Sequence, residues 1–198
     1  DFSVPKTYTN IEAFKIDYLR ERITFPIICK PTFGSGGKNT FVINNMESLE
    51  VNFKENMLIQ EYLSDAVEYG VDVFNTFEKK PVRCVIKRKV SMRSGETDKS
   101  YTVVDAKMTS SMLRLANALG HIGNLDCDVM VNNGKYYIID LNPRFGGGYP
   151  ATHAVGVNLL ELILKMINNE LIVPDFNSYE DRVLVMKTIS IIKTKWEE

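Results

Sequence analysis

The sequence predicts an α+β fold in which a small group of strands and helices precedes a larger group built on an antiparallel sheet. Short apolar runs with alternating side chains recur along the chain, which is typical of strands. Two of these runs meet at Asn132-Asn133-Gly134-Lys135, a sequence that favours the tight turn of a β-hairpin. Residues 107–119, by contrast, have the spacing of apolar residues that predicts a helix.

The remaining elements are predicted in chain order. A short helix spans Ile11–Arg20, with Asn10 as its N-cap. The smaller group has strands at 25–30, 40–43 and 57–62 and a helix at 46–53. The larger group begins near Glu68 and has strands at 71–77, 82–92 and 101–104, the helix at 107–119, the hairpin, a helix at 158–168 and a last strand around 182–189. We expect the polar segment Ser91–Ser100 to form an exposed turn or a loop beside the cleft between the groups.

The composition argues against several classes of function. The formal net charge of −1 gives no indication of a nucleic-acid or acidic-membrane partner. Cys29, Cys84 and Cys127 each lie in apolar sequence, and we interpret them as reduced core residues of a cytoplasmic protein. No Cys–His spacing suits zinc, and His121 and His153 alone support a catalytic triad poorly.

The segment Asp140-Leu-Asn-Pro-Arg-Phe-Gly-Gly-Gly148 carries the strongest chemical signal. Because side chains alternate along a strand, Asp140, Asn142 and Arg144 can project together from a strand end. Oxygen ligands beside a fixed cation suit Mg²⁺ that holds a polyphosphate. The alternative is a strand that ends in a Pro–Gly turn, with Asp140 and Arg144 as an ordinary ion pair.

Asp128 lies in the other strand of the hairpin, and pairing across the turn brings it near Asp140. Like charges on adjacent strands destabilise the sheet unless a cation separates them. A divalent metal between the strands is our interpretation. Asp126 lies on the same face and is the alternative partner, but Asp128 is nearer the middle of its apolar run.

Two earlier regions are compatible with a nucleotide. An apolar strand delivers Lys30 to a loop that contains Gly34, Ser35, Gly36, Gly37 and Lys38, where backbone amides and ammonium groups can approach phosphates. The loop is neither a P-loop nor a Rossmann fingerprint, because a strand follows it; a plain hairpin is the alternative. The strand end Glu61-Tyr62-Leu63 offers backbone groups to an adenine edge, and Glu68 could accept hydrogen bonds from a ribose. The simpler interpretation of this region is two strands joined by a loop, without a ligand.

Taken in order, these motifs resemble those of the ATP-grasp superfamily, and most of all the large chain of carbamoyl-phosphate synthase and short stand-alone proteins similar to it. The resemblance covers about residues 4–162. The matching motifs are Phe25-Pro-Ile-Ile-Cys-Lys-Pro31, Gly34-Ser-Gly-Gly-Lys38, Ile59-Gln-Glu-Tyr-Leu63, Glu68-Tyr-Gly-Val-Asp72 and Asp140–Gly148.

The resemblance implies a role for each site residue. Lys30 would contact the ATP phosphates, and Gly34–Gly37 would form a lid with Lys38 nearby. Glu61, Tyr62 and Leu63 would hold adenine, and Glu68 the ribose. Asp128, Asp140 and Asn142 would carry Mg²⁺, or Mn²⁺ in its place, while Arg144 would stabilise the transferred phosphoryl group. The family usually has Glu at the position of Asp140 and Glu or Gln at that of Asp128. Arg88 and Arg93 lie where family members place a basic residue that reaches the phosphates.

The same resemblance implies the ATP-grasp fold, two α+β lobes with ATP in the cleft between them. Residues 22–65 would form the small lobe with the lid, and 66–198 the large lobe with the metal site. Residues 1–21 would be a linker and helix that follow an N-terminal domain absent from this chain, so the chain would be the ATP-grasp fragment.

The function implied is that of an ATP-dependent ligase that activates a carboxylate as an acyl phosphate for attack by an amine or ammonia. A nucleotide-binding module without catalysis is the alternative, and an α+β domain with neither function is the third possibility. The partners implied are ATP and an unidentified carboxylate–amine pair, with a homodimer as an option and no nucleic acid or membrane. Tyr149 and His153 are the residues we nominate for the acceptor.

Overall fold

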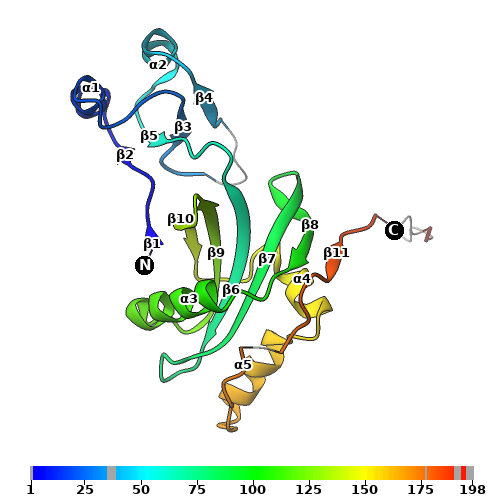
Figure 1. Ribbon diagram of the computed structural model, residues 1–198. Coiled ribbons are helices and arrows are strands. Elements are labelled where there is room, and N and C mark those ends of the chain that lie inside the picture. Colours follow the sequence, from blue (N-terminus) through cyan, green and yellow to red (C-terminus); the bar gives the residue numbers. More distant parts are fainter. Residues whose placement is uncertain (1, 35–38, 177, 190–192, 195–198) are drawn as a thin grey trace, which may run out of the picture.

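The computed structural model describes residues 2–34, 39–176, 178–189 and 193–194, and these form two antiparallel-rich sheets. A four-stranded sheet has the order β2-β5-β3-β4, and a seven-stranded sheet has the order β1-β10-β9-β6-β7-β8-β11. Figure 1 shows the small sheet with α1 and α2 at one end of the molecule, above the long strands of the large sheet. The expected α+β class with a larger antiparallel lobe is therefore confirmed.

The small lobe has one compact apolar core. Phe14, Ile27, Cys29, Leu49 and Ile59 are fully buried in it. β3 lies between β4 and β5 and pairs with both in antiparallel fashion, so its alternate residues face this core. The elements are β2 (Thr7–Tyr8), α1 (Ile11–Leu19), β3 (Ile27–Pro31), β4 (Phe41–Ile43), α2 (Met46–Asn52) and β5 (Met57–Glu61).

The first residues of the chain pair with both sheets, whereas we expected residues 1–21 to form a linker and a helix. β1 (Phe2–Ser3) pairs in parallel with the large sheet, and β2 pairs with β5 of the small sheet. Helix α1 begins after Asn10, whose side chain accepts from the Ala13 amide, and it contributes Phe14 to the small-lobe core. We therefore propose that the small lobe extends back to include this helix.

The large lobe has two packed faces, because alternate strand residues point to opposite sides of the sheet. Val71, Ile86 and Cys127 lie on the face covered by α3, and Phe74 and Val85 lie on the face that packs against α5. The elements are β6 (Val67–Asn75), β7 (Pro81–Arg93), β8 (Glu96–Thr102), α3 (Ala106–Leu119), β9 (Gly123–Asn132), β10 (Lys135–Asn142), α4 (Tyr149–Ala154), α5 (Leu159–Ile167) and β11 (Leu184–Met186).

The polar segment Ser91–Ser100 is mostly strand rather than loop. β7 and β8 pair almost to their ends, and the chain reverses at Ser94 and Gly95, which both have positive φ. The expectation of a loop therefore holds only for this tight turn, although Gly95 does border the cleft. Residues 149–154 form the short helix α4. Among the described residues, no helix is both long and apolar enough to cross a bilayer.

Candidate functional site

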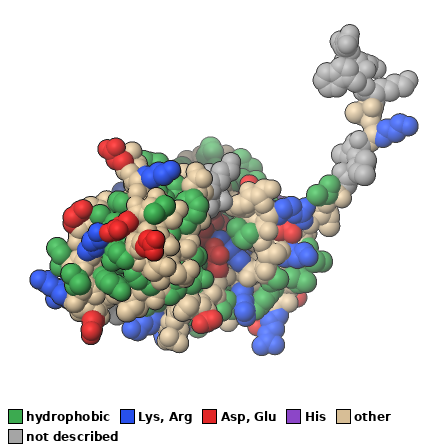
Figure 2. All heavy atoms as spheres, turned by 90° about the horizontal axis from the view of Figure 1, so that it is seen from above, with side chains coloured by type: hydrophobic (Ala, Val, Ile, Leu, Met, Phe, Trp, Pro, Cys, Tyr) green, Lys and Arg blue, Asp and Glu red, His purple; other side chains and the backbone are tan. Residues whose placement is uncertain are grey.

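A cavity of about 770 Å³ lies between the two lobes, and it gathers most of the residues nominated from the sequence. Figure 2 shows acidic and basic side chains in the hollow near the centre of the view. The small lobe contributes one wall and the large sheet the other. The nominated residues on these walls are Lys30, Gly34, Glu61, Tyr62, Leu63, Glu68, Asp128 and Asp140. Ser35, Gly36, Gly37 and Lys38 lie outside the described residues.

Lys30 reaches the cavity from β3, because it alternates with the buried residues Ile27 and Cys29. Its Nζ donates to Gln60 Oε1 at 2.9 Å. Burial lowers the pKa of Lys30, and the negative charge of Asp140 opposes this shift. Lys30 is therefore a lysine held by a neutral amide, with its charge open to an anion that enters the cavity.

The end of β5 also lines the cavity. Glu61, Tyr62 and Leu63 all line it. The Glu61 carboxylate accepts from the backbone amide of Lys6 at 3.1 Å, and the Glu61 amide donates to the Lys6 carbonyl at 2.8 Å. The N-terminal segment thus fixes the strand end whose backbone was expected to meet adenine.

The hairpin of β9 and β10 places Asp128 directly opposite Asp140, as the sequence predicted. Asn133 and Gly134 form a two-residue turn, both with positive φ. Uniform pairing from that turn would set Asp128 against Ile139, but the register shifts between Ile138 and Asp140. This bulge lets Ile139 and Asp140, consecutive in sequence, both line the cavity.

The cation beside Asp128 in the structure is Lys89, a residue that the sequence reasoning missed. Its Nζ donates to Asp128 Oδ1 at 2.7 Å and to Glu68 Oε1 at 2.6 Å. The side chain crosses β6 over Gly70, where an added Cβ would lie 3.5 Å from Lys89 Cε. Burial alone would lower the pKa of Lys89, but Asp128 and Glu68 together raise it. The lysine therefore remains charged and carries out part of the neutralisation that we had assigned to a metal.

Only part of the nominated metal set is free to bind a metal. Asp140 and Asn142 offer hard oxygens, and their side chains are joined by a hydrogen bond of 2.9 Å from Asn142 Nδ2 to Asp140 Oδ2. The Asp128 carboxylate is occupied by Lys89. Within the described ranges, no group of three His, Cys, Asp or Glu side chains is arranged to hold a metal ion. The pair Asp140 and Asn142 fits Mg²⁺, whereas Asp128 is already neutralised in part by Lys89.

Arg144 follows β10 and projects into a second cavity of about 530 Å³ that adjoins the first. Its Nη1 lies 3.4 Å from Asp126 Oδ2 and donates to the Phe145 carbonyl at 3.0 Å, and the side chain is 58% exposed. Burial raises the pKa of Asp126 to about 6, helped by the nearby charges of Asp72 and Asp128. Asp126 is therefore the partner of Arg144 rather than of Asp140.

The second cavity is the more polar of the two, and it lies over the glycines that follow Arg144. Its further lining residues include Lys87, Glu96, Thr97, Ser100 and Gly146–Gly148. A side chain at Gly146 would place its Cβ 2.0 Å from Asp126 Oδ2, so glycine is required for this close approach. An anionic group in this cavity would meet the Arg144 guanidinium beside the first cavity.

Four other nominated residues lie outside both cavities. Arg88 donates to the hydroxyl of Tyr101 at 2.9 Å, and Arg93 pairs with Asp98, so neither reaches the cleft. Tyr149 and His153, nominated for the acceptor, lie on α4, where Tyr149 makes an edge contact with the Phe145 ring and His153 lies beside the Tyr149 ring. The strand alternation of Lys87, Lys89, Asp126 and Asp128 was the signal that could have identified the correct basic residues.

The two lobes enclose a cleft lined by a loosely held lysine, the end of a strand and an acidic hairpin followed by arginine. This is the two-lobed arrangement that the sequence motifs predicted. The chain belongs to the ATP-grasp family, since the family's profile, described as the ATP-grasp domain, matches residues 1–148.

Curated relatives include carbamoyl phosphate synthases. The large chain, C-terminal section, of Methanocaldococcus jannaschii is 25% identical over 180 residues, which cover 81% of this chain and 28% of that protein. The large chain of Halobacterium salinarum is 24% identical over 169 residues, 77% of this chain and 16% of its own length. The chain thus spans less than a third of the length of these relatives.

Solved structures show the same fold. A biotin carboxylase from Campylobacter jejuni, described as a complex with β,γ-ATP, superposes with a TM-score of 0.71 at 19% identity and covers 92% of this chain and 46% of that one. N5-carboxyaminoimidazole synthetase from Staphylococcus aureus, complexed with ADP, gives a TM-score of 0.69 at 18% identity, with 88% and 49% covered.

Proposed function

We propose that this protein is the nucleotide-binding and phosphoryl-transfer part of a ligase that uses ATP to activate a carboxylate as an acyl phosphate, which an amine or ammonia then attacks. One observation carries the proposal. The cavity that holds Lys30, the β5 strand end and Asp140 adjoins the polar cavity that holds Arg144 and the glycine loop, and the two share Lys89, Asp128 and Asp140 as lining residues.

In this proposal the residues of the first cavity bind the nucleotide, and Arg144 in the second cavity contacts the transferred phosphoryl group. Lys30 binds the phosphates, Glu61, Tyr62 and Leu63 hold the base, and Glu68 accepts from the ribose once it leaves Lys89. Asp140 and Asn142 would hold Mg²⁺, which supplies charge neutralisation at the phosphates when bound. Arg144 holds the oxygens of the phosphoryl group as it moves to the carboxylate, because its planar fork can contact two oxygens together.

Carbamoyl phosphate synthesis is one case of this chemistry, in which bicarbonate and then carbamate are phosphorylated, and the proposal covers carboxylate–amine pairs in general. A cytoplasmic location is also part of the proposal, because Cys29, Cys84 and Cys127 are all buried and free.

The second candidate function is a nucleotide-binding module that performs no chemistry. The ion pair of Asp128 with Lys89 favours it, since that contact occupies one of three expected metal ligands. Arg144 argues for the enzyme, because a binder needs no exposed guanidinium beyond the nucleotide cavity.

ADP release by the purified protein distinguishes the two functions. The protein is mixed with Mg·ATP and screened against amino acids, small acids and bicarbonate, each with and without ammonia or an amine. The ligase predicts ADP release that requires one acid–amine pair. ATP binding without ADP release for any pair would support the module instead.

A further inference from the structure

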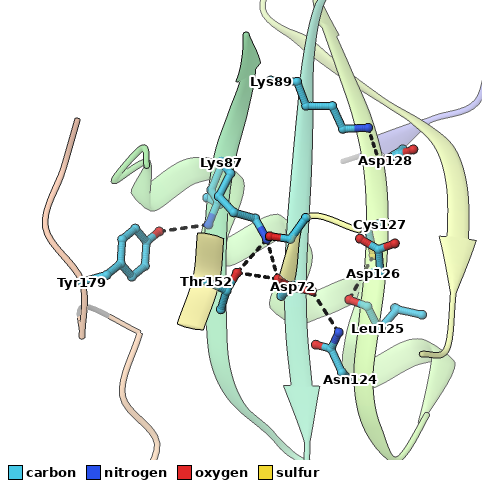
Figure 3. Close-up of polar contacts among 12 residues, drawn as sticks. Asp72, Lys87, Lys89, Asn124, Leu125, Asp126, Cys127, Asp128, Thr152 and Tyr179 are labelled. Carbon is cyan, nitrogen blue, oxygen red and sulfur yellow. Dashed lines mark hydrogen bonds and ion pairs between the residues drawn. The ribbon is translucent and has the colours of Figure 1, made fainter. Parts of the chain in front are cut away.

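A buried network of polar and charged side chains lies under the loop that carries Arg144. Asp72 on β6 and Lys87 on β7 form an ion pair, with side chains only 1% and 3% exposed. Figure 3 shows these two residues joined to Thr152 of α4 and Asn124 of β9. None of the four was nominated from the sequence.

The hydrogen bonds of the ion pair are shared among elements far apart in sequence. Lys87 Nζ donates to Asp72, to Thr152 Oγ1 at 2.7 Å and to the Gly148 carbonyl at 3.3 Å, which uses all three donors of an ammonium. The Thr152 hydroxyl donates to Asp72 Oδ2 at 2.5 Å. Asn124 Nδ2 donates to the other carboxylate oxygen at 2.9 Å. Asp72 is therefore the common centre of the network.

Two contacts of the network end on the backbone of residues 144–148, the loop that carries Arg144. Lys87 holds the carbonyl of Gly148, and Asn124 Nδ2 donates to the carbonyl of Arg144 at 3.1 Å. Both ends of the five-residue stretch from Arg144 to Gly148 are thus tied, through one side chain each, to the same buried carboxylate.

Stability alone does not account for these residue types. Burying an ion pair costs several kcal/mol per ion in desolvation, and replacing such a pair with apolar residues of similar size is often neutral or stabilising. The pair makes directed contacts to two backbone carbonyls that apolar side chains could not make. The network therefore fixes the geometry of the loop.

We propose that Asp72, Lys87, Asn124 and Thr152 are positioning residues that fix the backbone of residues 144–148, and so set where Arg144 and the glycine amides meet the transferring phosphoryl group. This inference rests on the proposed function of Arg144. A displacement of about 1 Å at a reacting group can cost about 100-fold in rate, so loosening the loop should lower kcat. ATP affinity should persist, because the residues of the nucleotide cavity are untouched.

The test compares variants of the network with matched controls. Thr152→Val removes the hydroxyl at nearly constant volume, and Thr152→Ser restores it. The double variant Asp72→Leu/Lys87→Met removes both charges together, so that neither is left buried alone. Ser111→Ala is the control, since Ser111 is a buried hydroxyl on α3, on the opposite face of the sheet.

Two readouts are needed, and the first does not depend on turnover. Hydrogen exchange of the peptide over residues 143–149 should become at least tenfold faster in Thr152→Val and in the double variant, and stay at the parent rate in Thr152→Ser and Ser111→Ala. In the ADP-release assay, kcat should fall about 10- to 100-fold in the first two variants, with KM for ATP within about threefold of the parent.

A folded double variant with the exchange of the parent over residues 143–149, or with the kcat of the parent, would overturn the inference. A parent protein that releases no ADP with any acid–amine pair would instead contradict the proposed function. The exchange measurement would then still decide whether the network holds the loop.

Discussion

Lys89 forms ion pairs with Glu68 and Asp128, whereas the sequence suggested a metal ion between Asp128 and Asp140, and the lysine changes how the acidic cleft is neutralised. Cross-strand carboxylates such as Asp128 and Asp140 do need a cation nearby, and that part of the reasoning holds. The identity of the cation could not be predicted from the hairpin alone. It depends on β7, which lies two strands away in the sheet, and on Gly70, which lets the lysine cross.

Asp140→Asn tests whether Asp140 serves the ligand or the fold. Without ligand, the free energy of unfolding should be unchanged or higher by up to about 1 kcal/mol, because one of two facing charges is removed. Most of the stabilisation by Mg·ATP should disappear, since a ligand stabilises only through its affinity for the folded state. Thermal melts of both proteins with and without Mg·ATP give the comparison, with Glu161→Gln on α5 as the control. A variant that melts well below the parent without ligand would make Asp140 a structural residue.

Arg144→Lys tests the role of the guanidinium fork. Lysine keeps the charge but cannot hold two oxygens in a plane, so kcat and kcat/KM should fall together by about 10- to 1,000-fold while KM for ATP changes little. Steady-state ADP release measures both constants. An increase in KM with the kcat of the parent would mean that Arg144 only binds the ground state.

The hairpin shows what strand patterns can and cannot predict. The Asn133-Gly134 turn and the approach of Asp128 to Asp140 followed from the sequence, but the bulge at Ile139 did not, because uniform alternation contains no signal for an extra residue. The helices with clear N-caps, Asn10, Asn45 and Asn158, begin within one residue of their predicted starts. Strands of two residues, β1 and β2, are too short to carry a period.

Because of the bulge, the neighbouring residues Ile138 and Ile139 lie in different environments. Ile139 lines the cavity between the lobes, whereas Ile138 packs against the core under α3. Ile139→Ala should weaken ATP binding about three- to tenfold with little effect on the melting temperature, and Ile138→Ala should lower stability by about 1–3 kcal/mol with ATP affinity intact. Calorimetric titration and thermal melts measure the two effects. Equal effects of both substitutions on ATP affinity would contradict the bulged register.

The turn from α3 into β9 contains a group whose charge opposes folding in mild acid. His121 contacts the Val73 carbonyl at 3.3 Å, and burial lowers its pKa below the ordinary value of 6.5. The unfolded state therefore takes up its proton first, so the stability from His121 is complete above pH 6.5 and is lost as the pH falls below it. Urea unfolding at pH 7.5 and 5.5 should show a smaller loss in His121→Gln than in the parent. An identical loss in both proteins would exclude this contribution.

At the scale of the whole molecule, the N-terminal segment and the link after β5 both join the lobes. β1 belongs to the large sheet and β2 to the small one, so the chain crosses between lobes at residues 4–6 and again at 62–66. The order of five motifs predicted the fold and the walls of the cleft. It could not predict the buried contacts of Lys87 and Asn124 with the Arg144 loop, which depend on strands brought together only by the three-dimensional fold.

On the proposed function, the cleft between the lobes binds ATP with Mg²⁺. Calorimetric titration of the 198-residue chain with ATP, with and without Mg²⁺, tests it most directly. We expect saturable heat with 1:1 stoichiometry, tighter binding when Mg²⁺ is present, and affinity reduced at least tenfold in Lys30→Met, whose ammonium faces the cavity. The titration uses protein at about 1 mM, where a binding free energy as weak as about −4 kcal/mol is detectable. A folded chain that gives no heat with ATP in either condition would contradict ATP binding in the cleft.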